Sequence, residues 1–254
     1  MREGTEMNYE RGVLSLVVYG LIVLSGCQDD QHAAPRPESS SITIKKQRFE
    51  RWRKAAEEGN SDAQYDIGVL YYNGEGVNQD YKQAAKWYLK AAEQGDADAQ
   101  FQSGAMYYNG LGVKQDSKQA VKWYRKSAEQ GIDDAQYCLG VMYHSGEGVK
   151  QDHKQAVEWY LKAAEQRNAD AQFQLGAMYY NGLGVKQDYK QAVKWYRKAA
   201  GQGNVDAQYY IGVMYFNGEG VKQDYKQAVE WYRIAAEQGH ELAKETLRDR
   251  GAAP

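Results

Sequence analysis

Five tryptophans recur along the chain at a constant interval of 36 residues. They are Trp87, Trp123, Trp159, Trp195 and Trp231. Nearly the same phrase, Gln-Ala-Val-Lys-Trp-Tyr-Arg-Lys-Ala-Ala-Glu-Gln-Gly, surrounds each of them. A fixed period of about 20–50 residues indicates a supersecondary unit that is repeated and stacked in a line. Because each unit of such an array buries its apolar face against its neighbours, the spacing alone predicts a solenoid rather than a chain folded around one central core.

The repeated unit divides into two helical segments, which we call helix A and helix B, and residues 62–95 form its first copy. In helix A, Ala63 and Ile67 lie about one turn apart on the same face. The glycines of the segment 74–77, Gly-Glu-Gly-Val, end this helix because glycine tolerates positive φ. Asp80, followed by glutamine three residues later, predicts the N-terminal cap of helix B. The apolar face of helix B consists of Ala84, Trp87, Tyr88, Ala91 and Ala92.

The same pattern repeats in four further units, and shorter matches flank the array. The further units begin at Asp98, Asp134, Asp170 and Asp206. Residues 46–58 match helix B alone, and residues 241–249 match the start of a helix A, with Ala243 and Leu247 at its apolar positions. We therefore predict an all-α solenoid over residues 46–249, with five full helix-turn-helix repeats and terminal half-repeats that cover its apolar ends.

These motifs carry a resemblance to a known family. The pattern Ala-x-x-x-Leu-Gly-x-x-Tyr, then Gly-x-Gly-Val, Asp, and Ala-x-x-Trp-Tyr-x-x-Ala-Ala-x-x-Gly occurs five times in register. It resembles the Sel-one-like repeat (SLR) family, a branch of the tetratricopeptide-like helical repeats, over residues 46–249. The resemblance implies a right-handed α/α superhelix whose concave face holds other proteins. It also implies a role as an adaptor in secretion, envelope assembly or host contact.

Two residues depart from the repeated pattern. Arg167 replaces the turn glycine that ends helix B in the other units, and we expect Asn168 to adopt the left-handed conformation in its stead. Ser103 stands where Ile67 stands in the first unit. A polar residue at this apolar position should weaken its helix locally.

The units also alternate, so that the chain repeats every 72 residues as well as every 36. Leu111 and Leu183 occupy a loop position that holds glutamate in the first, third and fifth units. The glutamates are Glu75, Glu147 and Glu219. We infer that a block of two repeats was duplicated, and we predict loop tips that are alternately acidic and apolar.

A partner-binding groove is expected on the A helices, because in tetratricopeptide-like arrays this helix lines the concave surface. The predicted groove residues are Tyr65, Tyr72, Asn73, Phe101, Tyr108, Asn109, Tyr137, His144, Phe173, Tyr180, Asn181, Tyr209, Phe216 and Asn217. Aromatic rings and amides suit an extended peptide, or a sugar chain stacked on the rings. The alternative is that the rings at the Tyr65 position pack between helices, and burial of Tyr72, Tyr108 and Tyr180 would rule the groove out.

The start of the chain, which is either Met1 or Met7, predicts an export signal. The apolar run over residues 13–24 has 12 residues, fewer than the roughly 20 that span a membrane, and arginines precede it. It ends in Leu-Ser-Gly-Cys27, which resembles a bacterial lipoprotein lipobox. The resemblance implies cleavage before Cys27 and acylation of this residue, and Gln28 after it favours the outer membrane. The alternatives are an uncleaved anchor and an ordinary signal with a chance cysteine.

These observations predict the domain organisation. Residues 1–26 form the signal peptide, and residues 27–45 the lipidated cysteine and a polar, Pro- and Ser-rich tether that we expect to be disordered. The solenoid occupies residues 46–249, and residues 250–254 are a tail. We expect the mature protein on the periplasmic face of the bacterial outer membrane, with the tether holding the solenoid off the lipid.

Charge and residue types exclude several function classes. The 32 Lys and Arg residues balance 34 Asp and Glu residues, with no basic stripe that would attract a nucleic-acid backbone. In the third unit His144 and His153 lie near Cys138, Glu147 and Asp152, and these residue types can bind zinc. Both histidines, however, occupy tyrosine positions of the repeat, so we expect no metal and no cofactor. With no Ser-His-Asp or Cys-His arrangement, we expect no enzyme activity.

The sequence thus predicts a monomeric, non-enzymatic adaptor at the bacterial cell envelope that binds a protein or peptide in its concave groove. Two alternatives stay open. One is an envelope factor associated with peptidoglycan or exopolysaccharide, and the other is a surface-exposed or secreted protein that contacts a host. All three use the same scaffold and differ in what occupies the groove.

Overall fold

The structure, a computed structural model, describes residues 38–249. All regular secondary structure in that range is α-helical. The helices are α2 (Glu38–Glu57), α3 (Ser61–Asn73), α4 (Tyr81–Glu93), α5 (Ala97–Asn109), α6 (Ser117–Glu129), α7 (Asp133–Ser145), α8 (His153–Glu165), α9 (Ala169–Asn181), α10 (Tyr189–Ala200), α11 (Val205–Asn217), α12 (Tyr225–Glu237) and α13 (Glu241–Asp249). The chain divides into two compact units, residues 1–41 and 42–254, and the second holds the repeats. The predicted signal peptide, Cys27 and the tail lie outside the described residues.

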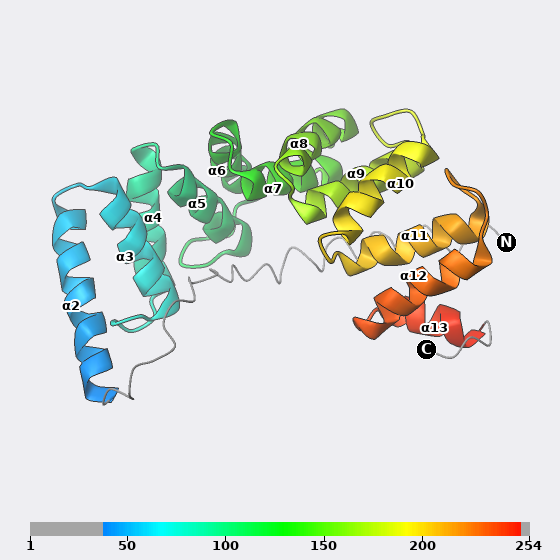
Figure 1. Cartoon of the computed structure of the whole chain (residues 1–254). Helices are drawn as coiled ribbons and strands as arrows, with labels where there is room; N and C mark the ends of the chain where they lie inside the picture. Colours follow the sequence, from blue (N-terminus) through cyan, green and yellow to red (C-terminus); the bar gives the residue numbers. More distant parts are fainter. Residues whose placement is uncertain (1–37, 250–254) are drawn as a thin grey trace. The chain divides into compact units, whose positions relative to one another are not determined.

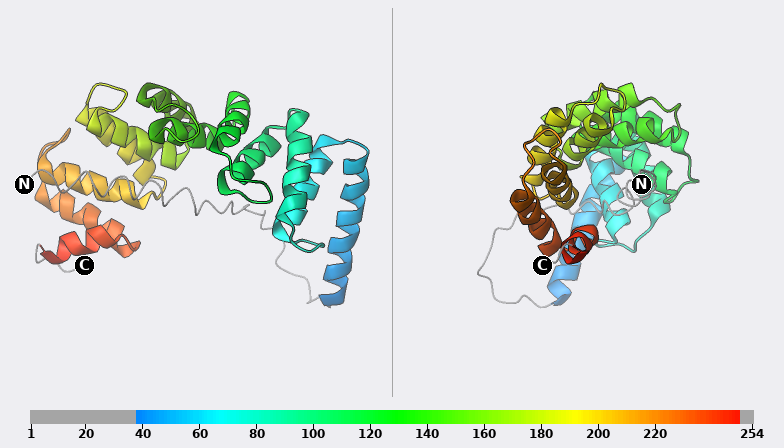
Figure 2. Two further views of the ribbon diagram at one scale, coloured as in Figure 1. Left: turned by 180° about the vertical axis from the view of Figure 1, so that it is seen from behind. Right: turned by 90° about the vertical axis from the view of Figure 1, so that its right-hand side faces the viewer.

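From α3 to α12 the helices form five pairs, in which the odd-numbered helix is helix A of a unit and the even-numbered helix is helix B. Each helix from α3 to α13 packs against its neighbours in the chain. Figure 1 shows this succession, and Figure 2 shows the same order from behind. In α13, Ala243 and Leu247 are fully buried at the positions predicted for a further helix A. The predicted all-α solenoid of five helix-turn-helix repeats is therefore confirmed.

The first half-repeat is longer than predicted. Helix α2 starts at Glu38, so residues 38–45, which were assigned to the disordered tether, are helical. Pro37 directly precedes the helix in sequence, and proline followed by glutamate in the first turn is a favourable helix start. Further along α2, Phe49 and Ala56 are buried in one cluster with residues of α3. No helix of the described part is long and apolar enough to cross a membrane.

Hydrogen bonds hold both ends of the loop between helix A and helix B. Asp80 Oδ1 accepts from the backbone N–H groups of Lys82 at 2.9 Å and Gln83 at 3.1 Å, which confirms the predicted cap. Gln79 Nε2 donates to the carbonyl oxygen of Tyr72 at 2.8 Å, which stabilises the end of helix A. No feature of the repeated sequence pattern had indicated this second contact. It recurs in every unit, through Gln115, Gln151, Gln187 and Gln223.

The two helices of a unit approach closely at one glycine. A Cβ atom on Gly68 would lie 2.6 Å from the ring atoms Cδ1 and Cε1 of Tyr88, whose side chain is buried. The equivalent pairs are Gly104–Tyr124, Gly140–Tyr160, Gly176–Tyr196 and Gly212–Tyr232. Because no side chain fits between the helix A backbone and this ring, the glycine is a packing requirement of the unit.

Buried glutamines join consecutive helices. Gln64 Nε2 donates to the carbonyl oxygen of Ala56 in the preceding helix B at 3.0 Å, and Gln64 Oε1 accepts from Gln94 Nε2 at 2.7 Å. The second bond is repeated by Gln100–Gln130, Gln136–Gln166, Gln172–Gln202 and Gln208–Gln238. A buried amide that is bonded at both its donor and its acceptor fixes how neighbouring helices sit along each other.

The two departures from the repeat pattern have different outcomes. Arg167 itself adopts a φ of +72°, whereas Asn168 has a φ of −60° and caps α9 by accepting from the Ala171 N–H at 2.9 Å. The prediction that Asn168 absorbs the turn is therefore wrong, because its role as the cap holds it in the extended region. Ser103 is fully buried and its Oγ has no hydrogen-bond partner, and the local weakness expected of its helix stays a prediction.

Candidate partner-binding face of the A helices

The predicted groove residues lie at three equivalent positions of the A helices, and we call the surface that they form the helix-A face. In the first unit the three positions are Tyr65, Tyr72 and Asn73. Rings at the Tyr72 position are half-buried in all five units. The asparagines at the third position are exposed in the four units that have one. The helix-A face therefore combines partly accessible rings with accessible amides.

Each ring at the Tyr65 position packs against the helix B tyrosine of its own unit. The ring centroids of Tyr65 and Tyr88 are 5.7 Å apart. The same contact is made by Phe101–Tyr124, Tyr137–Tyr160, Phe173–Tyr196 and Tyr209–Tyr232. Four of the five rings nevertheless remain half-buried rather than buried. At this position, therefore, the ring packs between two helices and is also partly exposed on the helix-A face.

Phe173 is the exception, and its prediction as a groove residue is wrong. Its side chain is only 8% exposed. Tyr210 of the next unit lies against it, with ring centroids 5.8 Å apart, and Tyr210 also stacks on Tyr196 at 5.5 Å. The residues at the Tyr210 position in the other units are smaller: Asp66, Gln102, Cys138 and Gln174. Burial of Phe173 therefore depends on a residue in another repeat.

The ring at the Tyr72 position pairs with the first residue of helix B. The pairs and their centroid distances are Tyr72–Tyr81 at 5.2 Å, His144–His153 at 5.0 Å, Tyr180–Tyr189 at 5.3 Å and Phe216–Tyr225 at 5.0 Å. Tyr72, Tyr108 and Tyr180 are half-buried, so the burial that would have ruled out a groove is not observed.

The acidic and apolar loop tips differ in how they contact the preceding unit. Glu147 Oε2 accepts from the Tyr108 hydroxyl at 3.2 Å, and Glu219 Oε2 accepts from the Tyr180 hydroxyl at 2.9 Å. Leu111 instead packs in an apolar cluster of the first unit. Burial and the neighbouring Glu147 raise the pKa of Tyr108 to about 12, so this hydroxyl stays a donor at neutral pH. The residue at the loop tip therefore determines how a unit contacts the unit before it.

Charge is segregated between the two kinds of helix. Every helix B carries two to four Lys or Arg residues, whereas the five A helices carry none. The acidic residues of the A helices are Asp62, Asp66, Asp98, Asp133, Asp134, Asp170 and Asp206. Burial, with repulsion from nearby aspartates, raises the pKa of four of these carboxyls: Asp66, Asp98, Asp134 and Asp170. The A helices thus hold carboxylates with no Lys or Arg of their own.

The histidines and the cysteine of the third unit lie in largely buried surroundings. The Nδ1 atoms of His144 and His153 are buried and have no hydrogen-bond partner. Burial, and then the charge of His153, lowers the pKa of His144, which keeps this imidazole neutral. Burial raises the pKa of the Cys138 thiol to about 12, which keeps it protonated and unreactive. Among residues 38–249, no group of three or more His, Cys, Asp or Glu side chains is placed to hold a metal ion.

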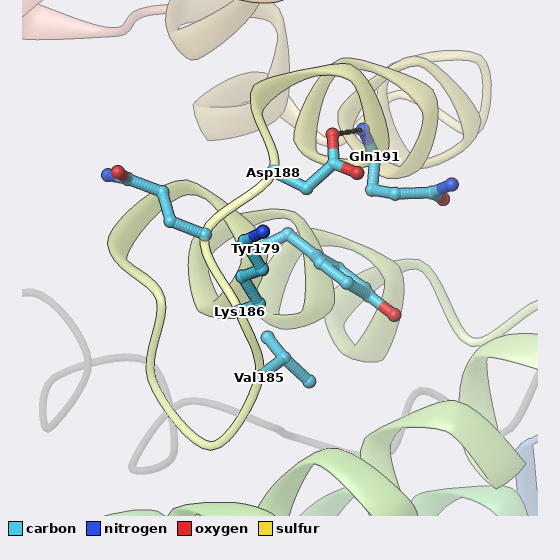
Figure 3. Close-up of a pocket in the computed structure, with 6 residues that line it drawn as sticks. Tyr179, Val185, Lys186, Asp188 and Gln191 are labelled. Carbon is cyan, nitrogen blue, oxygen red and sulfur yellow. Dashed lines mark hydrogen bonds between the residues drawn. The ribbon is translucent and has the colours of Figure 1, made fainter.

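A cavity of about 630 Å³ opens beside the loop between α9 and α10. It is lined by Tyr179, Val185, Lys186, Gln187, Asp188 and Gln191 (Figure 3). The carboxylate of Asp188 already accepts from the Gln191 N–H at 3.1 Å as the cap of α10. The cavity contains none of the predicted groove residues.

Comparison with known proteins identifies the repeat. The Sel1 repeat family matches five consecutive segments: residues 61–96, 97–132, 133–168, 169–204 and 205–240. Each segment begins at or beside the start of a helix A, so these are the units that the tryptophan spacing predicted. No curated protein matches the chain.

Two solved structures resemble the chain in sequence and fold. A protective antigen present in uropathogenic Escherichia coli strains, which displays an SLR fold, is 43% identical with a TM-score of 0.77. The match covers 79% of this chain and 43% of that one, so this chain spans less than half of that relative. A Sel1 repeat protein from Oxalobacter formigenes is 36% identical with a TM-score of 0.75, over 83% of this chain and 84% of that one.

Proposed function

Because the chain belongs to the Sel1 repeat family, whose members are generally non-enzymatic scaffolds for protein interaction, we propose that it is an adaptor that binds a protein or peptide through the helix-A face. The observation that carries this proposal is the row of half-buried rings and exposed amides along consecutive A helices. A half-buried ring loses little freedom on binding, because packing already holds one side of it.

The amides of the helix-A face can recognise a peptide backbone. Asn109 Nδ2 donates to the carbonyl oxygen of Ala105 at 2.9 Å, and Asn181 Nδ2 donates to that of Ala177 at 3.0 Å. These bonds orient the side chains and leave each Oδ1 able to accept from a backbone N–H. Repeated acceptors beside repeated rings suit a partner that is extended along the array.

Site-specific photo-crosslinking tests this function. A photo-reactive amino acid is placed at Asn73, Asn109 or Asn181 in the full chain, and at Lys122 or Lys194 on exposed helix B positions as the control. We expect the same partner protein to be crosslinked from the asparagine positions and not from the lysine positions, with the products identified by mass spectrometry. Crosslinking from helix B alone, or from neither face, would refute the proposal.

We also propose that the adaptor acts at the bacterial cell envelope, anchored through acylated Cys27 on the periplasmic face of the outer membrane. The lipobox-like segment before Cys27 supports this proposal, and two or more acyl chains anchor a protein durably where one does not. Incorporation of a labelled fatty acid should be lost in Cys27→Ala, with the protein released from the membrane fraction. Labelling that persists in Cys27→Ala would contradict the anchor.

One observation favours a second candidate function, a surface-exposed protein that contacts a host. The relative from uropathogenic Escherichia coli is described as a protective antigen, and it is 43% identical to this chain. Protease added to intact cells should cleave the chain only if it reaches the outer surface. Full protection in intact cells, with cleavage after lysis, would leave the periplasmic adaptor and exclude this candidate.

A further inference from the structure

The chain already supplies cations to the rings of its B helices. Lys90 Nζ lies 4.1 Å from the ring centroid of Trp87, and the equivalent lysines lie 3.8 Å from Trp159 and 3.9 Å from Trp195. On the helix-A face of the described chain, no Lys or Arg lies over the rings of Tyr65, Tyr72 or Tyr180. The A helices themselves contain neither Lys nor Arg. The cations that do lie over other A-helix rings come from the B helices, Arg125 over Tyr143 and Arg197 over Tyr215.

Carboxylates lie beside two rings of the helix-A face: Glu147 Oε2 accepts from the Tyr108 hydroxyl at 3.2 Å, and Glu219 Oε2 accepts from the Tyr180 hydroxyl at 2.9 Å. Burial, and then the charges of Asp98, Asp96 and Asp66, raise the pKa of the Tyr65 hydroxyl. Arg48 of α2 is the cation whose charge acts on Asp66, and within residues 38–249 no cation acts in this way on Asp98. An aromatic face with carboxylates at its rim is the arrangement that attracts a Lys or Arg side chain, through cation–π contact and charge together.

We propose that the occupant of the helix-A face is a cationic, extended segment of another protein, whose Lys or Arg side chains lie over the half-buried rings and pair with aspartates of the A helices. This proposal rests on the proposed function and names the chemistry of its partner. The loop glutamates add negative charge at the other end of the A helices, so an acidic polysaccharide or a nucleic acid would be repelled along the same face.

Synthetic peptides test the charge requirement directly. The probe is a fluorescein-labelled 12-residue peptide that alternates arginine with glycine, and its matched controls carry citrulline or glutamate in place of arginine. Citrulline keeps the shape and removes the charge. We expect the citrulline peptide to bind at least about tenfold more weakly than the arginine peptide and the glutamate peptide not to bind. Binding of the arginine peptide should weaken as salt is raised, because exposed charges are screened.

Two variants of equal charge change locate the site. The first is Asp62→Asn, Asp66→Asn, Asp98→Asn, which removes three carboxylates from the A helices. The second is Glu129→Gln, Glu158→Gln, Glu230→Gln, which removes three from exposed helix B positions. We expect the first to weaken the arginine peptide about tenfold and the second less than twofold, with circular dichroism confirming equal helicity. If the first triple variant loses helicity, Asp98→Asn is compared with Glu129→Gln, with the same order expected.

Three results would overturn the inference. The first is equal binding of the arginine and citrulline peptides, and the second is equal weakening by both triple variants. The third is self-association at low salt that the Asp→Asn variant abolishes, since the occupant would then be the basic B helices of a second copy. A partner protein can crosslink from Asn73, Asn109 or Asn181 while the peptides show no preference for arginine. That combination would contradict only this inference. Absence of any crosslink would instead refute the proposed function.

Discussion

Arg167 holds a φ of +72° at the turn where Gly203 holds +89° one unit later. At Gly203 a Cβ atom would meet nothing within 4 Å, so the cost of a side chain at this turn is conformational and not steric. The left-handed conformation costs a residue other than glycine about 1–2 kcal/mol. Arg167→Gly should therefore raise the free energy of unfolding by about 1 kcal/mol.

The same chain contains the matched control. Gly203→Arg should lower the free energy of unfolding by about 1 kcal/mol, and urea unfolding followed by tryptophan fluorescence measures both. A decrease for Arg167→Gly would mean that contacts of the arginine side chain outweigh the backbone conformation at this turn.

Ser103 and Leu175 occupy the same place in units that are otherwise nearly identical over helix A. Both side chains are fully buried, but the Ser103 Oγ has no hydrogen-bond partner. Ser103→Leu removes an unpaired buried hydroxyl and adds buried apolar area, so it should raise the free energy of unfolding by about 1–3 kcal/mol. Leu175→Ser should lower it by a similar amount or more, because it also leaves a cavity. If Ser103→Leu destabilises the chain, the second unit has closed around the smaller residue.

The repeat could be predicted because its determinants are local. Asp80 caps helix α4 by accepting from an amide two residues further along the chain, and Gly74 directly follows the helix that it ends. What could not be predicted depends on a neighbouring unit. Burial of Phe173 needs Tyr210, and the bond from Gln64 needs the carbonyl group of Ala56 in the preceding helix. Sequence spacing identifies the units well, and it says much less about the contacts between them.

The helix-A face was predicted by the same logic, with the same weakness. Rings at the Tyr65 and Tyr72 positions could be assigned to one helical face from spacing alone. That the Tyr108 hydroxyl would bond to Glu147 could not, since the two residues lie in different units and only the alternation of loop residues pointed to it. Arg167 is the reverse case: the left-handed conformation was expected at Asn168, but Asn168 is the N-terminal cap of α9 and is extended.

Asn168 bridges two units, and Asp96 stands at the equivalent place between the first two. Asn168 Nδ2 donates to Asp134 Oδ1 at 3.0 Å while its own Oδ1 caps α9. Asp96 also caps its helix, by accepting from Ala99 N–H at 2.7 Å, but it cannot donate. After burial, the charge of Asp96 is the next cause of the raised pKa of Asp98. Asp96→Asn should keep the cap and stabilise the chain by up to about 1 kcal/mol at neutral pH.

The sign of the pH dependence follows from that raised pKa. A carboxyl whose pKa is raised on folding contributes stability that is present at low pH and lost as the pH rises through the folded value. The advantage of Asp96→Asn should therefore be largest near pH 7 and shrink on acidification, as Asp98 becomes protonated in both chains. Asn168→Asp is the reverse control and should lose stability at pH 7. Thermal melts at pH 7 and at a lower pH measure this, and an advantage that grows on acidification would contradict it.

Tyr108 and Tyr72 occupy equivalent positions, but only Tyr108 faces a loop glutamate of the following unit. Its hydroxyl donates at 3.2 Å to Glu147 in the loop of the following unit, whereas for Tyr72 the loop of the following unit carries Leu111 at that place. Tyr108→Phe should lower the free energy of unfolding by about 1 kcal/mol, and Tyr72→Phe by less than about 0.5 kcal/mol. Glu147 keeps the Ser117 hydroxyl as a donor at 2.8 Å, so the variant does not leave its carboxylate unpaired.

The gap between the unmodified chain and Tyr108→Phe should also depend on pH. Burial and Glu147 raise the pKa of Tyr108 to about 12, so its contribution is complete below about pH 10 and is lost as the pH rises towards 12. Urea unfolding at pH 7, 9 and 11 should show a constant gap at the first two values and a smaller one at the third. A gap that widens at pH 11, or equal losses in Tyr108→Phe and Tyr72→Phe, would show that the link to Glu147 does not stabilise the junction between these units.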